Sequence, residues 1–121
     1  MFLMNKYAWV LLVLTLVIGG CANSLKEVSL PSASADDVEL AREHLAHIND
    51  LSVTDTGYIT YYVWVEEGFV WNTSSIKSSS YEWSCETMIQ FLEAGFVIKM
   101  GFKGKGGREE HYDLAKCQAD S

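Results

Sequence analysis

The first regular pattern of apolar and polar residues along the mature part of the chain is helical and spans residues 36–49. Apolar side chains recur there every three or four positions, so they form one stripe on a helix. Ser34 stands three residues ahead of Asp37, which is typical of a helix N-terminus, where a hydroxyl caps the first turn and a carboxylate suits the helix dipole. We therefore predict a helix from about Asp36 to Asn49. Its stripe consists of Val38, Ala41, Leu45 and Ile48.

From Gly57 onward the period changes to two. Residues 58–65 alternate and are rich in aromatic and β-branched side chains, so we predict a strand. Residues 66–68 predict a turn and residues 69–73 a second strand, which together make an antiparallel hairpin. Residues 74–80 contain five serines and predict a strand end or a loop. One face of the first strand carries Ile59, Tyr61, Val63 and Val65, and the other carries Tyr58, Thr60, Tyr62 and Trp64.

A second helical stripe follows at residues 85–94. Ser84 is suited to cap this helix, and Gly95 is suited to end it as a C′ glycine. The cysteine of the stripe is expected on the buried side. The stripe consists of Cys85, Met88, Ile89 and Leu92.

The C-terminal part of the chain returns to period two. Residues 96–102 predict a strand, residues 104–107 a glycine-rich turn and residues 108–115 a last strand, with Tyr112 and Leu114 on one side. The positions expected to point inward on the first of these strands are Phe96, Ile98, Met100 and Phe102.

These elements predict one small α+β domain over residues 36–121, with a four- to five-stranded antiparallel sheet, two helices and one disulfide. A chain of this size buries about 60 to 65% of its unfolded surface on folding, so its net free energy of folding is small.

The N-terminus has the layout of a secretory signal peptide. One lysine, Lys6, precedes an apolar run of 11 residues, Ala8–Ile18, which is short of the ~20 residues that a membrane-spanning helix needs. The run ends in Ile18-Gly19-Gly20-Cys21, which resembles a bacterial lipoprotein processing site. The resemblance implies that residues 1–20 are removed and that Cys21 is acylated, including by palmitate. The alternative is plain secretion with a spare cysteine.

Several acyl chains on Cys21 would make a lasting membrane anchor, because one chain alone binds only marginally at ~0.8 kcal/mol per methylene. Residues 21–35 carry no period and contain the only proline, so we predict a lipidated cysteine followed by a flexible tether. The residue after the cysteine is Ala22 and not aspartate, which in similar lipoproteins accompanies transport to the outer membrane. We expect a periplasm-facing location there.

The two remaining cysteines, Cys85 and Cys117, would lie in an oxidising compartment. We predict a disulfide between them, worth roughly 3 to 4 kcal/mol by the chain-entropy estimate. Two free thiols are the alternative.

The formal net charge is −7, and removal of Lys6 with the signal peptide makes it −8. Such a charge argues against nucleic acid or an anionic lipid surface as the main partner. The basic run containing Lys99, Lys103, Lys105 and Arg108 is interpreted as a solvated loop, or as a local patch for an acidic partner or a phosphate-rich surface.

No catalytic motif, phosphate-binding glycine loop or metal signature is found in the sequence, so we predict neither an enzyme nor a cofactor. His44 and His47 lie one helical turn apart, but the familiar zinc spacing is four residues and no third ligand is evident. His111 next to Glu109 and Asp113 is explained by ordinary strand neighbours.

The order of these parts resembles the α/β pilotins of type II secretion systems, of the AspS or GspS-beta kind. The resemblance covers essentially the whole mature chain. It is carried by the lipidated cysteine, the helix bearing Cys85, and the segments Glu93-Ala94-Gly95-Phe96-Val97-Ile98 and Tyr112-Asp113-Leu114-Ala115-Lys116-Cys117.

The resemblance implies a carrier without chemistry. Such pilotins bind the C-terminal tail of a secretin subunit, which orders as a helix in an apolar groove, and take it to the outer membrane. We expect a monomer with a groove beside the first helix and the hairpin. Its predicted partner-binding residues are Tyr62, Trp64, Trp71, Lys99 and Arg108.

The dense aromatic residues of the hairpin leave two further functions open. One is a periplasmic envelope-binding or adaptor lipoprotein that uses an aromatic sheet face for peptidoglycan or another protein. The other is a small inhibitor of a periplasmic enzyme. Exposed rings would serve any of these, because a face so rich in rings needs a covering layer or a partner.

Overall fold

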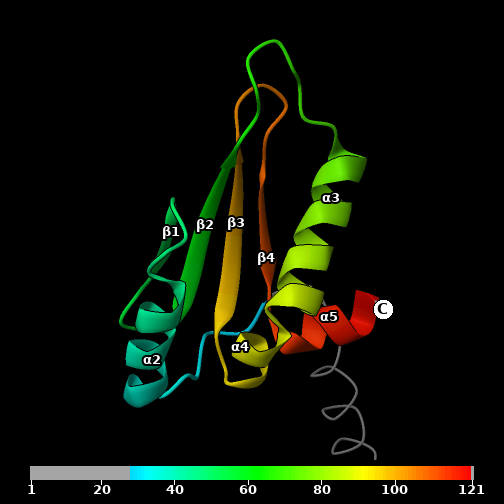
Figure 1. The fold of residues 1–121 in the computed structure, drawn as a ribbon. Helices are drawn as coiled ribbons and strands as arrows, with labels where there is room; N and C mark the ends of the chain where they lie inside the picture. The colour runs from blue at the N-terminus through cyan, green and yellow to red at the C-terminus, as the bar shows by residue number, and fades with distance from the viewer. Residues whose placement is uncertain (1–27, 121) are drawn as a thin grey trace, which may run out of the picture.

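The computed structural model describes residues 28–120 (Figure 1). The predicted α+β class is confirmed, but the predicted count of two helices is wrong, since four α-helices occur in this part of the chain. In chain order the elements are α2 (Ala35–Leu45), β1 (Leu51–Val53), β2 (Tyr58–Trp64), α3 (Thr73–Tyr81), the π-helical segment η1 (Glu82–Thr87), α4 (Ile89–Glu93), β3 (Val97–Lys103), β4 (Glu109–Tyr112) and α5 (Leu114–Asp120).

The four strands form a mixed sheet in the order β1-β2-β3-β4. The prediction of an antiparallel sheet is wrong for its central pair, because β2 and β3 run parallel, with Tyr58 opposite Val97 and Trp64 opposite Lys103. The outer pairs, β1 with β2 and β3 with β4, are antiparallel. The chain leaves β2, crosses over through α3, η1 and α4, and returns to the same end of the sheet, which makes the next strand parallel.

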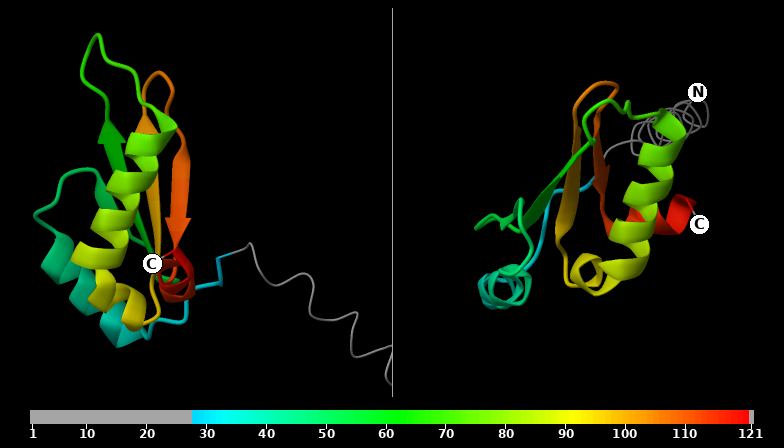
Figure 2. Two further views of the ribbon diagram at one scale, coloured as in Figure 1. Left: turned by 90° about the vertical axis from the view of Figure 1, so that its right-hand side faces the viewer. Right: turned by 45° about the horizontal axis from the view of Figure 1, so that its top comes forward.

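One face of the sheet is covered by the helices (Figure 1, Figure 2). A single cluster of buried side chains draws on every helix and on the inward positions of β2, β3 and β4, so residues 28–120 fold around one core. Because side chains alternate along a strand, the intervening residues of β2 and β3 project from the opposite face. The cluster includes Val38, Ala41, Leu45, Ile59, Ile76, Cys85, Met88, Leu92, Phe96, Ile98, Met100, Phe102, Tyr112 and Cys117.

The first predicted helix is confirmed as α2. The Ser34 hydroxyl accepts a hydrogen bond from the Asp37 amide at 3.1 Å, and the stripe ending at Leu45 is buried. The helix ends four residues earlier than predicted, and Asp50 adopts a positive φ of 62° before β1. Strand β1 is only three residues long and was not predicted from the sequence.

The predicted hairpin after β2 is wrong. Residues 69–72 form no strand, and α3 begins at Thr73, capped by the Asn72 side chain, which accepts a hydrogen bond from the Ser75 amide at 2.8 Å. The serine-rich segment is therefore a helix, although serine has a low helix propensity. Burial of Ile76 and Ser80, one turn apart, explains this outcome, since both side chains are fully enclosed against the sheet.

The second predicted helix has a different beginning. Helix α3 continues into η1, so Ser84 is not an N-cap; it is buried, with its Oγ 3.7 Å from the Met100 Sδ. The buried positions Cys85, Met88 and Leu92 are confirmed. Gly95 has a positive φ of 99°, as expected for the glycine after a helix.

The last predicted strand is shorter than expected. Strand β4 stops at Tyr112, because the Asp113 carboxylate accepts a hydrogen bond from the Lys116 amide at 2.8 Å and starts α5. Leu114 therefore belongs to a helix. The disulfide between Cys85 and Cys117 is confirmed, with Cα atoms 5.5 Å apart, and it joins η1 to α5.

Residues 28–34 have no regular secondary structure but lie against the end of the sheet. The Ser29 amide donates to the Asp113 carboxylate at 2.9 Å, and the Ser32 amide donates to the Gly95 carbonyl at 2.8 Å. This part of the predicted tether thus contacts the domain. The predicted signal peptide and Cys21 lie outside the described residues. Between residues 28 and 120, no helix has the length and apolar character needed to cross a membrane.

Candidate functional site

An apolar groove of about 390 Å³ lies between α2 and α4. Leu40 stands at its edge and is 52% exposed. Beside it, the Phe91 ring packs edge-on against Phe96, with centroids 5.9 Å apart. The groove is lined by Asp37, Leu40, Ala41, His44, Leu45, Gln90, Phe91, Ala94 and Phe96.

The groove follows from how the two helices are built. Helix α4 is only five residues long and ends at Glu93, two residues before Gly95, so it covers a small part of the space beside α2. The two alanines that line the gap, Ala41 and Ala94, are too small to fill it. The result is a hollow with an aliphatic wall on one side and an aromatic wall on the other, which can accept apolar side chains of a partner.

The surroundings of the groove are acidic. Helix α2 carries two carboxylates in its first turn, and one of these, Asp37, lines the groove. Of the two further acids on this helix, Glu39 forms an ion pair with Arg42 at 2.8 Å. A segment that docks here is therefore favoured when its apolar face is flanked by basic residues.

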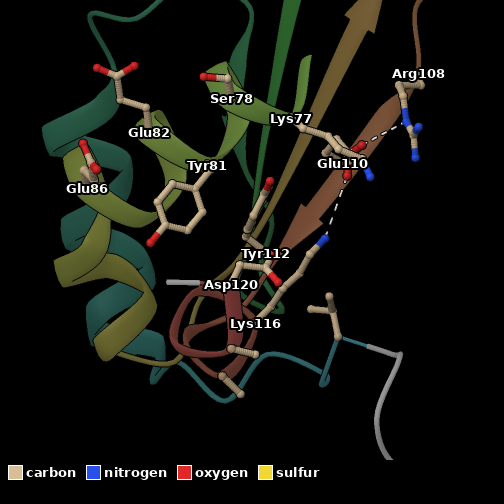
Figure 3. A pocket seen from close by; sticks show the side chains of 13 residues that line it. Lys77, Ser78, Tyr81, Glu82, Glu86, Arg108, Glu110, Tyr112, Lys116 and Asp120 are labelled. Atoms are coloured by element: carbon tan, nitrogen blue, oxygen red, sulfur yellow. Dashed lines mark ion pairs between the residues drawn. The ribbon is translucent and has the colours of Figure 1, made fainter. Parts of the chain in front are cut away.

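A second, larger hollow lies between α3, β4 and α5 (Figure 3). Its volume is about 1500 Å³, and its lining includes three cations and four carboxylates. We call it the charged cleft. It is lined by Val28, Lys77, Ser78, Tyr81, Glu82, Glu86, Arg108, Glu110, Tyr112, Ala115, Lys116, Ala119 and Asp120.

The Glu110 carboxylate lies on the β4 wall of the charged cleft and is buried (Figure 3). Arg108 Nε lies 2.9 Å from one of its oxygens and Lys116 Nζ lies 3.8 Å from the other, as the dashed lines of Figure 3 mark. The oxygen facing Arg108 makes no hydrogen bond, so that contact is a charge interaction without good hydrogen-bond alignment. Two cations thus compensate one buried carboxylate, and these charges are satisfied within the domain.

Two side chains have clearly shifted acid–base properties. Burial raises the pKa of Tyr112, and its hydroxyl lies 2.9 Å from the Ser80 Oγ, a hydrogen bond that opposes this rise. The hydrogen bond from Arg42 to Asp55 raises the pKa of the Arg42 guanidinium. Tyr112 lines the charged cleft, whereas Arg42 also donates to the Val53 carbonyl and joins α2 to β1.

The five predicted partner-binding residues do not form one surface. Tyr62, Trp64 and Lys99 lie on the face of the sheet opposite the core. Trp71 is half-buried, stacks edge-on against Phe102 and donates to the Lys103 carbonyl at 2.9 Å, which is a structural role. Arg108 lines the charged cleft and pairs with Glu110.

The histidines considered as metal ligands in the sequence analysis do not belong to a cluster of metal-binding side chains within residues 28–120. His44 and His47 are both exposed on and after α2. His111 contacts Glu109 on β4, as expected for alternate residues of a strand. Among residues 28–120, no group of three or more His, Cys, Asp or Glu side chains is arranged to hold a metal ion.

Sequence reasoning missed the groove between α2 and α4. One signal was present, because Leu40 is a leucine on α2 outside the buried stripe. Phe91 likewise lies next to Leu92 of the second stripe but only half-buried. An apolar residue outside the buried stripe indicates an exposed apolar position on a helix. The helix that forms the other wall of the groove could be identified only from the fold.

No family model, no curated protein and no solved structure matches this chain.

Proposed function

We propose that this chain is an outer-membrane lipoprotein that binds the C-terminal segment of a type II secretion secretin and pilots it to the outer membrane. The observation that carries this proposal is the apolar groove between α2 and α4, with Leu40 and Phe91 on its two walls. A groove between two helices is a recurrent way to bind an amphipathic helix, whose apolar side chains enter it at spacings of three and four residues.

The surrounding chemistry supports such a partner. The Cys85–Cys117 disulfide suits a protein that works in an oxidising compartment, and the Ile18-to-Cys21 motif resembles a lipoprotein processing site. The acids of α2 favour a tail with basic residues beside its apolar face. A tail that folds only on binding loses conformational entropy in that step, which lowers its affinity. A lower affinity allows release of the tail once the secretin ring assembles.

The test is a titration of the mature chain, residues 21–121, with fluorescein-labelled peptides from secretin C-termini of the same genome. Saturable anisotropy together with a gain of helical circular dichroism is expected. Leu40→Glu should weaken binding about tenfold or more, because it places a charge in an apolar contact. Leu30→Glu is the matched control, since Leu30 is 83% exposed and does not line the groove.

The outcomes separate the partner from the site. Absence of binding at high micromolar peptide contradicts the pilotin proposal. Binding that Leu40→Glu and Leu30→Glu leave equally strong keeps the partner but rejects the groove. Thermal unfolding of both variants shows whether a loss of binding is merely a loss of fold.

A further inference from the structure

The face of the sheet that points away from the helices carries a regular set of rings and cations. We call it the open face. Trp64 and Tyr62 are its most exposed rings, at 64% and 38%. The set comprises Tyr58, Thr60, Tyr62 and Trp64 of β2, Lys99 and Lys103 of β3, and Glu109 and His111 of β4, which contact each other.

Each lysine of the open face lies over a tyrosine of the neighbouring strand. Lys99 Nζ lies 4.0 Å from the centroid of the Tyr58 ring, and Lys103 Nζ lies 4.7 Å from the centroid of the Tyr62 ring. These cation–π contacts hold the ammonium groups at the surface without neutralising them. No carboxylate of residues 28–120 forms an ion pair with either lysine, although the whole chain is strongly acidic.

A glycine makes the open face flat. Tyr62 is paired with Gly101 across the two parallel strands, and a Cβ at Gly101 would lie only 2.6 Å from the Tyr62 Cδ1. The missing side chain thus allows the Tyr62 ring to lie over β3. A broad surface of rings and cations results, and neither the groove nor the charged cleft borders it.

The exposed end of this face lies far from the N-terminal segment. Ser29 is bonded to Asp113 at the end of the sheet where β4 finishes, whereas Trp64 and Lys103 end their strands at the opposite end. The loop after β2 adds Phe69 and Val70, 65% and 57% exposed, at that distal end (Figure 1). Strands of seven residues are about 23 Å long.

We propose that the open face binds peptidoglycan, a periplasmic polymer whose sugar rings carry peptide stems with free carboxylates. The flat apolar side of a sugar ring stacks on Trp64, and the stem carboxylates pair with Lys99 and Lys103, whose ammonium groups lie over Tyr58 and Tyr62. A peptide partner would instead need pockets for its side chains, and a flat face offers none of the kind that peptide recognition uses. This inference rests on the periplasmic location of the proposed function.

The test is co-sedimentation of the mature chain with purified, protease-treated sacculi. Saturable pelleting that a muramidase abolishes is expected. Trp64→Ala should weaken it about tenfold, because a stacked ring is lost. Lys103→Gln should weaken it about threefold, while the matched control Lys77→Gln, on the other side of the molecule, leaves it unchanged. Pelleting that Trp64→Ala does not weaken, or no pelleting at all, overturns the proposal.

The two binding proposals can be contradicted independently of each other. Leu40→Glu should lose the secretin peptide and keep the sacculus, whereas Trp64→Ala should lose the sacculus and keep the peptide. If Trp64→Ala instead loses the peptide, the open face is a protein-binding surface and the glycan proposal is wrong.

Discussion

The two faces of the sheet are made from alternate residues of the same strands, yet their chemistry is opposite. Ile59 is completely buried beneath the helices, while the adjacent Thr60 lies among tyrosines and lysines on the open face. The helical side holds the core, the disulfide and the fully enclosed serines. The open side holds rings that no helix covers. The exposed rings therefore do not belong to the core, which lies on the other face of the sheet.

The largest effect is expected from the disulfide, which holds the helical layer together. Replacing both Cys85 and Cys117 by serine should lower the free energy of unfolding by roughly 3 to 4 kcal/mol, because the unfolded chain regains the freedom of the loop between them. Urea unfolding followed by circular dichroism measures this. Dithiothreitol should destabilise the wild type by a similar amount and leave the double variant unchanged. Equal stability of the two proteins would show that packing alone holds α5 on η1.

The next effect compares neighbouring residues of β2. Ile59→Ala should cost about 3 kcal/mol, because it removes a fully buried side chain and leaves a cavity. Thr60→Ala, on the open face, should change stability by no more than about 0.5 kcal/mol. Both predictions are tested by the midpoints of urea unfolding, provided that the dependence of the unfolding free energy on urea concentration is the same for the variants and the wild type. Similar losses from the two variants would mean that the open face is covered in solution, for instance by a second copy of the chain.

The smallest effect concerns the Tyr112–Ser80 hydrogen bond on the helical side. Tyr112→Phe should cost about 1 kcal/mol at neutral pH, because the Ser80 hydroxyl loses a buried partner. Tyr62→Phe on the open face is the matched control for removal of a phenolic hydroxyl. Thermal unfolding near pH 7 should separate the two variants.

The same tyrosine gives an alkaline signature. Burial raises the pKa of Tyr112 above that of an unfolded tyrosine, so the folded state holds its proton more tightly. This contribution is fully present below pH ~10, the pKa of a free tyrosine, and is lost as the pH rises through the raised pKa. Stability profiles from pH 8 to pH 11 should therefore be flatter for Tyr112→Phe than for the wild type. An unchanged slope would show that Tyr112 does not titrate with unfolding.

Much of the fold could be predicted from local patterns. The stripe of α2, the alternation of β2 and β3 and the helix-ending Gly95 are set by neighbouring residues, and the structure confirms them. The cysteine pair is also confirmed, because Cys85 and Cys117 were the two cysteines left once Cys21 was assigned to lipid. Helix α3 could not be predicted, because serine favours other conformations. The helix is stabilised by burial of the Ile76 and Ser80 side chains, which the sequence did not reveal. The candidate surfaces were only partly visible. Trp64 and Trp71 were both predicted to bind a partner, but Trp64 is exposed whereas Trp71 packs against the core.

Spacing along the chain specifies which segments are amphipathic, where several helix ends lie and which cysteines could pair. The parallel arrangement of β2 and β3, the groove between α2 and α4, and the position of all the helices on one side of the sheet became evident only in the folded molecule. These three features arise from contacts between residues distant in sequence. The energy of those contacts exceeds the local preference of segments such as the one that forms α3.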